Sequence, residues 1–228
     1  MALQITYFGH SCFGVVAGGR RLLFDPFVSG NPKAAHLRAE DLQADYVLIS
    51  HAHGDHLADA LQVLQRTGAK LISNFEIASY YEAKGISGVE KLNFGGRIAT
   101  SFGHVRMLHA QHSSQFPDGT YGGNPGAFLV ESSDGNFYFA GDTALTLDLQ
   151  LIPRYATVKL AFLPIGGYFT MDYNDAAIAA EFLQSEIVIG MHYDSFPPIT
   201  IDHDAAQKAF ADSQAKLILM PVGGTLTV

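Results

Sequence analysis

The sequence of 228 residues has one cysteine, no tryptophan and no long apolar run. A single cysteine excludes an intrachain disulfide and suits a reducing compartment, so we expect a cytoplasmic protein. The absence of any run of about 18 apolar residues predicts that no segment spans a membrane. Residues 1–12 show no basic region followed by an apolar one, so no signal peptide is expected.

Basic residues are also scarce, and this limits the classes of molecule that the protein is expected to bind. Lys and Arg number 14 against 22 Asp and Glu, which gives a formal net charge of −8. Nucleic-acid binders usually carry a basic face, so no nucleic-acid partner is expected. The sequence has no GxSxG, no GxxxxGK[ST] and no GxGxxG after a strand, which argues against serine hydrolases and nucleotide cofactors. A small-molecule substrate is the expected partner, and nothing in the sequence indicates an oligomeric state.

Apolar runs and glycine-containing turns divide the chain into two strand-rich halves. Strands are predicted over residues 3–8, 11–16, 20–24, 45–50, 70–73, 91–94, 97–101, 104–108, 126–131, 136–140, 159–164, 186–191, 216–221 and 225–228. Helices are predicted after residue 56 and over 76–84, 172–184 and 202–213. Gly-Gly or Asp-Gly pairs at 18–19, 95–96 and 134–135 predict hairpin turns. A helix-covered sheet from each half would stack into helix, sheet, sheet and helix layers, an α/β (α+β) architecture.

Ten histidines are present, and three of them fall in the heptapeptide SHAHGDH. It follows a buried-strand pattern and precedes a helical one. Side chains alternate along extended backbone, so His51 and His53 share a side, and the following glycine lets the chain turn before Asp55 and His56. Imidazoles and a carboxylate together suit divalent zinc, manganese or iron. The alternative is a histidine-rich surface loop that holds no metal.

The pattern HxHxDH, here His51, His53, Asp55 and His56, resembles that of the metallo-β-lactamase superfamily. The resemblance implies a four-layer αββα fold over residues 1–228, with a one- or two-metal site at one edge of the sandwich. The segments TYFGHSCF, AQHSS and PIGGYFTM are similar to one branch of the superfamily. That branch contains the ascorbate-6-phosphate lactonase and many compact metal-dependent hydrolases.

The later ligands that the resemblance implies follow in the family's order. His112, in AQHSS, lies past a strand end, while His104 and His109 are rivals that fit ordinary strand positions. Asp142, in YFAGDT, would bridge two metals, unless it only caps a helix. Antibiotic-hydrolysing members often carry cysteine at that place, so this residue argues against a true β-lactamase. His192, in IGMHYD, would be the last ligand.

The resemblance thus implies two divalent cations per chain, with zinc expected first and manganese or iron as alternatives. The ligands of the first metal would be three imidazoles, from His51, His53 and His112. The ligands of the second would be Asp55, His56 and His192, with Asp142 as the bridge.

Several further residues have two interpretations each. The resemblance places His10, in GHS, near the metals as a proton donor, substrate contact or orienting group, and the alternative is an ordinary strand histidine. Asp25, in FDP, orients a ligand imidazole or caps a turn. His36 lines a substrate mouth or is exposed, and His203 is expected at an exposed helix start. The loop at Tyr168 walls the pocket or packs as an aromatic loop.

The expected reaction is hydrolysis of an ester, lactone or phosphoester by a hydroxide that bridges the metals. Metal binding lowers the pKa of water from 15.7 to about 7. Asp55 would bind the second metal and orient the nucleophile, and His10 would donate a proton. The alternatives are a di-iron or mono-iron redox protein on the same fold, and a metal-binding protein without catalysis. The substrate is not fixed by the fold.

Overall fold

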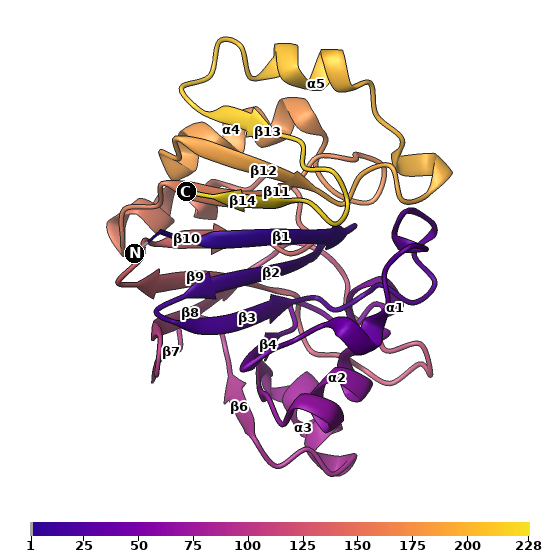
Figure 1. The fold of residues 1–228 in the computed structure, drawn as a ribbon. Coiled ribbons are helices and arrows are strands. Elements are labelled where there is room, and N and C mark those ends of the chain that lie inside the picture. Colours follow the sequence, from indigo (N-terminus) through magenta and orange to yellow (C-terminus); the bar gives the residue numbers. More distant parts are fainter. Residues whose placement is uncertain (1) are drawn as a thin grey trace.

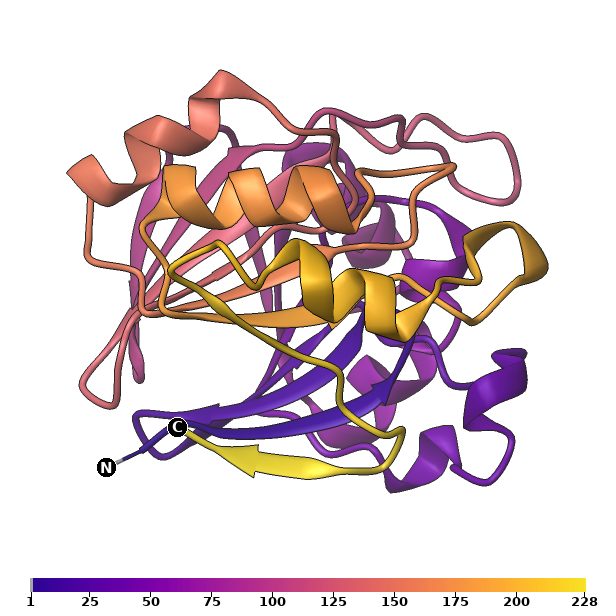
Figure 2. The same cartoon turned by 90° about the horizontal axis from the view of Figure 1, so that it is seen from above.

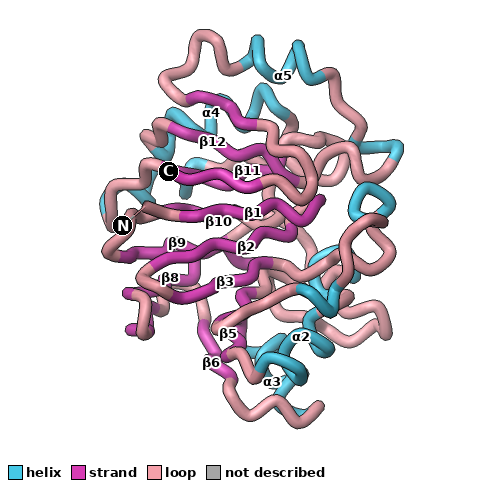
Figure 3. The backbone as a smooth tube through the Cα atoms, in the orientation of Figure 1, coloured by secondary structure: helices cyan, strands magenta, loops and turns pink. Residues whose placement is uncertain are grey.

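In the computed structural model, which describes residues 2–228, the chain forms two seven-stranded sheets (Figures 1 and 3). The first contains β1 (Gln4–Gly9), β2 (Cys12–Ala17), β3 (Arg20–Phe24), β4 (Tyr46–Leu48), β5 (Lys70–Asn74), β6 (Val89–Leu92) and β14 (Thr225–Thr227). Its order is β14-β1-β2-β3-β4-β5-β6. The pairs are antiparallel from β14 to β3 and parallel from β3 to β6.

The second sheet comes from the later part of the chain. It contains β7 (Arg97–Thr100), β8 (Gly103–His109), β9 (Gly126–Ser132), β10 (Phe137–Phe139), β11 (Leu160–Pro164), β12 (Ile187–Met191) and β13 (Lys216–Ile218). Its order is β13-β12-β11-β10-β9-β8-β7, antiparallel from β7 to β10 and parallel from β10 to β13. In each sheet, therefore, one part is an antiparallel meander and the other part is made of parallel strands.

Helices cover the outer faces. Near the first sheet lie α1 (Gly54–Leu57), α2 (Ala60–Thr67) and α3 (Phe75–Ala83), with the short 3-10 turns η1 (Pro32–Ala34) and η2 (Ala39–Asp41). On the second sheet lie α4 (Tyr173–Leu183), α5 (His203–Ala209) and the 3-10 segment η3 (Leu147–Arg154), with the turn η4 (Pro197–Ile199) nearby (Figure 2). The predicted four-layer architecture is confirmed. Within the described residues, no helix is long and apolar enough to cross a membrane.

Aromatic side chains join the two sheets across the middle of the sandwich. Phe24 on β3 stacks on Phe139 of β10 with ring centroids 4.6 Å apart, and Phe13 on β2 meets Phe162 of β11 edge-on at 4.9 Å. All four are fully buried. Strand side chains alternate between faces, so the inward positions of both sheets supply one shared core. A second cluster, which includes Leu23, packs the first sheet against α1, α2 and α3.

Two of the three predicted hairpins are confirmed, at 18–19 between β2 and β3 and at 134–135 between β9 and β10. The hairpin predicted at 95–96 is wrong. There β6 pairs only with β5, in the first sheet, and β7 pairs with β8, in the second. The Gly95 N–H donates to the Met107 carbonyl, so the turn is fixed where the chain passes between sheets. A glycine pair allows either kind of turn, because it fixes the bend but not the partner strand.

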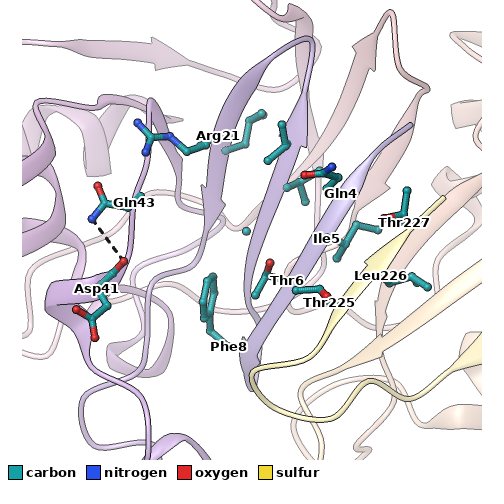
Figure 4. A pocket seen from close by; sticks show the side chains of 14 residues that line it. Gln4, Ile5, Thr6, Phe8, Arg21, Asp41, Gln43, Thr225, Leu226 and Thr227 are labelled. Carbon is teal, nitrogen blue, oxygen red and sulfur yellow. Dashed lines mark hydrogen bonds between the residues drawn. The ribbon is translucent and has the colours of Figure 1, made fainter. Parts of the chain in front are cut away.

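The outer face of β14, β1 and β2 is left open by the helices. A groove of about 440 Å³ runs along it, with Gln4, Thr6 and Phe8 of β1 beside Thr225 and Thr227 of β14 (Figure 4). None of the candidate metal ligands lines this groove.

Replacing Phe24 by alanine tests the shared core. Loss of a fully buried ring should lower the free energy of unfolding by about 3–5 kcal/mol, because a cavity remains between the sheets. Urea denaturation measures this. Phe75→Ala is the matched control, since Phe75 is 53% exposed and its loss should change stability little. Equal unfolding midpoints for the two variants would contradict the assignment of the core.

Candidate metal centre

The candidate ligands gather at one edge of the sandwich because each follows the end of a strand. His10 follows β1, His51 follows β4, His112 follows β8, Asp142 follows β10 and His192 follows β12. Strands that run parallel deliver the residues after their carboxyl ends to the same edge, which is where ligands bind in such sheets.

One group of imidazoles is formed by His51, His53 and His112, whose ligand nitrogens all lie within 4.8 Å of one another. The Nε2 atom of His51 is 3.0 Å from Nδ1 of His53. Two donors bound to one ion at bond lengths of about 2.0 Å and a tetrahedral angle lie about 3.3 Å apart. The spacing, which is that of a hydrogen bond in the metal-free chain, also fits two ligands of one cation.

A second group contains His10, Asp55, His56 and His192, again within 4.8 Å of one another. Three of them are the residues that the resemblance assigns to the second metal. The fourth, His10, has its Nε2 atom 3.2 Å from Oδ2 of Asp55. His10 therefore lies within the second group of candidate ligands.

The carboxylate of Asp142 lies between the two groups. Its Oδ2 atom is 2.9 Å from Nε2 of His192, 3.3 Å from that of His56, 3.6 Å from that of His112 and 3.9 Å from that of His51. Its Oδ1 atom and Nε2 of His56 are buried and make no hydrogen bond to described residues. Buried polar atoms usually have a partner. A pair of cations on either side of Asp142 fits this donor set.

Asp25 orients two of the imidazoles. It is fully buried, and its Oδ2 atom accepts hydrogen bonds from Nδ1 of His56 at 2.8 Å and from the Ser50 hydroxyl at 2.6 Å. Since that hydroxyl proton goes to Asp25, the Ser50 oxygen accepts from Nδ1 of His51 at 3.0 Å. In both imidazoles Nδ1 is the donor to these partners, so Nε2, which points toward Asp142, is the nitrogen that is left to bind a metal.

The charges around the centre also favour cation binding. Burial lowers the pKa of His51, His53 and His112, so these imidazoles are neutral at neutral pH and offer lone pairs. Burial alone would raise the pKa of Asp142, but His192 and His56 outweigh it and hold that pKa well below its usual range. His56 differs from the neutral imidazoles: burial would lower its pKa, but Asp142 and Asp25 raise it well above its usual value, so a divalent cation bound there would displace its proton.

The centre has an open and a closed side. The Asp55 side chain is 30% exposed and that of His112 is 14% exposed, and His53 is also partly exposed. The remaining members are buried, namely His10, His51, His56, Asp142 and His192. The open side of the centre is therefore the side of His53, Asp55 and His112.

The other histidines lie apart from both groups. His104 and His109 are on β8, and neither belongs to a ligand group among the described residues. His36 is exposed in the loop before η2. His203 begins α5, is 53% exposed and lies 2.7 Å from a carboxylate oxygen of Asp194.

The loop between β11 and α4 holds two aromatic rings at its tip, and Tyr168 is 79% exposed and Phe169 50% exposed. It is therefore not a packed aromatic loop. Three serines that touch imidazoles of the two groups, Ser50, Ser113 and Ser195, are not identified by the sequence analysis. Ser50 precedes the histidine motif directly, which was its only signal, and Ser195 had none.

Comparison with known proteins agrees with this geometry. A family model described as beta-lactamase superfamily domain matches residues 4–192. A UPF0173 metal-dependent hydrolase of Flavobacterium johnsoniae is 45% identical over 224 residues, covering 98% of this chain and 99% of that protein. The chain belongs to the UPF0173 family of metal-dependent hydrolases, within the β-lactamase superfamily.

Other UPF0173 relatives are similar over most of their length. The protein from Thermus thermophilus is 44% identical over 208 residues, which is 91% of each chain. Among solved structures, Igni18, a metallo hydrolase from Ignicoccus hospitalis, superposes with a TM-score of 0.89 at 34% identity and covers 100% of this chain and 99% of its own. The predicted superfamily and the predicted enzyme class are confirmed.

Asp25→Asn tests the orienting role. Asparagine tolerates the left-handed backbone of residue 25 (φ 41°) but cannot accept the same hydrogen bonds with two anionic oxygens. Zinc affinity should fall about 10- to 100-fold, as is usual for the partner of a ligand imidazole. Competition with a chromophoric chelator measures it. The control is Asp148→Asn, which changes an exposed carboxylate on η3. Wild-type zinc affinity in Asp25→Asn would show that Asp25 caps a turn and does not orient the ligand imidazoles.

Acid should destabilise the metal-free protein. The pKa of His10 is lowered to about 4 by burial and by His192, and burial also lowers the pKa of His51, His53 and His112. His56 acts in the opposite direction, because Asp142 and Asp25 raise its pKa against the effect of burial. The four histidines with lowered pKa outnumber it, so the unfolded chain takes up more protons than the folded one below about pH 6.5. Stability is present above that pH and declines as the pH falls toward 4. Urea titrations of chelator-treated protein between pH 7.5 and 5 check this, and a midpoint that rises with acid would contradict it.

Proposed function

We propose that the protein hydrolyses an ester, lactone or phosphoester bond in a small molecule, using two divalent cations bound at this edge. The observation that carries the proposal is the place of Asp142, whose Oδ2 atom lies within 4 Å of imidazole nitrogens from both ligand groups. Zinc is proposed as the native metal because imidazoles dominate the donor set, and manganese and iron accept the same ligands.

The two ions would be held by different loops. The first would bind the imidazoles of His51, His53 and His112, and the second would bind Asp55, His56 and His192, with Asp142 shared by both. Divalent cations held there would lower the pKa of a bound water to about 7 and would polarise a substrate oxygen.

The protein's own residues would position the reaction. The carboxylate of Asp55 is partly exposed on the open side of the centre, so it can orient a water molecule toward the substrate. Its pKa lies below the usual range because hydrogen bonding to His10 and the charge of His56 outweigh the effect of burial, and it therefore accepts hydrogen bonds at neutral pH. His51 and His56 are fully buried, so they exclude bulk water from the side of the centre that lies opposite Asp55.

The redox alternative shares the same donor set, since imidazole and carboxylate also bind iron. Metal identity and reaction type separate the two. A protein that purifies with iron alone and hydrolyses none of the tested substrates would favour the redox function.

Asp142→Ala should remove metal and hydrolysis together. The wild-type protein, purified without chelator, should carry about two ions per chain by elemental mass spectrometry and should hydrolyse a member of a panel of aryl esters, lactones and aryl phosphodiesters. The variant should lose at least one ion and its activity should fall to background, because both groups lose their shared ligand.

His109→Ala is the control, since it removes an imidazole that lies outside both ligand groups. Two ions and full activity in Asp142→Ala would rule out a shared carboxylate.

A further inference from the structure

His10 lies at the turn between β1 and β2 on a left-handed backbone, with φ 57°. This conformation is uncommon for residues other than glycine, and such strain is often found at functional sites. The turn is fixed to the loop after β12, because the His10 carbonyl accepts hydrogen bonds from the His192 N–H at 3.0 Å and from the Tyr7 hydroxyl at 3.2 Å. The two histidines are therefore held together by their backbones before any ligand is considered.

The His10 ring lies on the closed side of the centre. The side chain is 0% exposed, and its ring centroid is 4.1 Å from that of His192 and 5.4 Å from that of His56. Phe27 and Phe196 meet the ring edge-on and close it off further. A proton donor must reach the leaving group of the substrate. The burial of His10 does not favour that role.

Ser195 lies against the Nδ1 atom of the His10 ring. The Ser195 hydroxyl, which is buried, donates to the Tyr193 carbonyl at 3.3 Å, and its oxygen lies 3.1 Å from Nδ1 of His10. With its own proton on Tyr193, the hydroxyl oxygen accepts from Nδ1–H of His10 in the tautomer whose Nε2 atom binds a metal. The Nε2 atom faces a carboxylate oxygen of Asp55 at 3.2 Å, which is a hydrogen bond in the metal-free chain.

His10 and Asp55 belong to one group of candidate ligands, and a cation bound between their facing atoms would take the place of the proton that they share. The separation matches the spacing of about 3.3 Å that two ligands of one tetrahedral ion adopt. We propose that Nε2 of His10 is a further ligand of the second cation, together with Asp55, His56 and His192, and that Ser195 is the positioning residue that holds His10 in its ligating form. The inference rests on the proposed two-metal function.

The two cations would then differ in the number of side chains that bind them. Four side chains besides Asp142 would surround the second ion, whereas three would hold the first. Closed coordination is typical of structural sites, and an open position is typical of catalytic ones. The first ion, which has one ligand fewer and lies beside the partly exposed His53 and His112, is therefore the one with room for a substrate atom, and Asp55 of the second faces the same open side.

The test compares metal binding in four variants of the full-length protein, His10→Gln, Ser195→Ala, Ser195→Thr and His104→Gln. Each is measured for zinc stoichiometry and for zinc affinity by chelator competition, and the cobalt-substituted form is measured by visible absorption, which depends on ligand number and geometry. His104→Gln is the control, because it removes an imidazole from β8 outside the centre.

The expected result is selective loss of one ion. His10→Gln should keep one ion at wild-type affinity and bind the other at least about 100-fold more weakly, more than the loss of an orienting partner costs. Ser195→Ala should weaken the same ion about 10- to 100-fold and change the cobalt spectrum. Ser195→Thr, which retains the hydroxyl, should have the wild-type zinc affinity and cobalt spectrum. His104→Gln should also match the wild type.

Two ions at wild-type affinity and an unchanged cobalt spectrum in His10→Gln would overturn the ligand assignment and leave the two-metal function intact. Fewer than two ions in the zinc-loaded wild type would instead contradict the proposed function itself. Circular dichroism verifies that His10→Gln is folded. If it is not, Ser195→Ala decides, and wild-type zinc affinity in that variant overturns the inference.

Discussion

A buried carboxylate among imidazoles is the constraint on which this structure depends. Asp142 is 2% exposed, and its pKa is held low by His192 and His56, so it stays ionised where a lone charge would cost several kcal/mol. Positive charge must therefore be supplied from several directions at once. Loops from both sheets do this, with His56 from the first sheet and His192 from the second, and the sandwich brings them together.

The backbone near Asp142 shows how closely that convergence is built. Gly141 adopts a left-handed conformation (φ 59°), and a Cβ atom there would lie 2.7 Å from the Ser50 side chain and 2.9 Å from the Gly126 carbonyl. The loops after β4 and β10, which belong to different sheets, thus touch directly behind the ligands. The same Ser50 hydroxyl donates to Asp25, so packing and ligand orientation are coupled in one contact.

Local signals in the sequence predicted most of the fold and the ligand set. His51, His53, Asp55 and His56 were found because one strand end carries all four within six residues. Residues that lie outside a sequence motif were harder to interpret. Asp25 had two interpretations, since only the folded chain brings it 2.8 Å from His56. Ser195 had no signal, because its partner His10 is 185 positions away. The crossover at Gly95 was taken for a hairpin because turn chemistry does not specify which strand will pair.

Anomalous diffraction from zinc-loaded crystals tests the central claim most directly. The account predicts two peaks about 3.5–4 Å apart, the usual separation in two-metal sites. One peak should contact His51, His53 and His112, and the other Asp55, His56 and His192, with Asp142 between them. A single peak, or two peaks that do not share Asp142, would contradict the account.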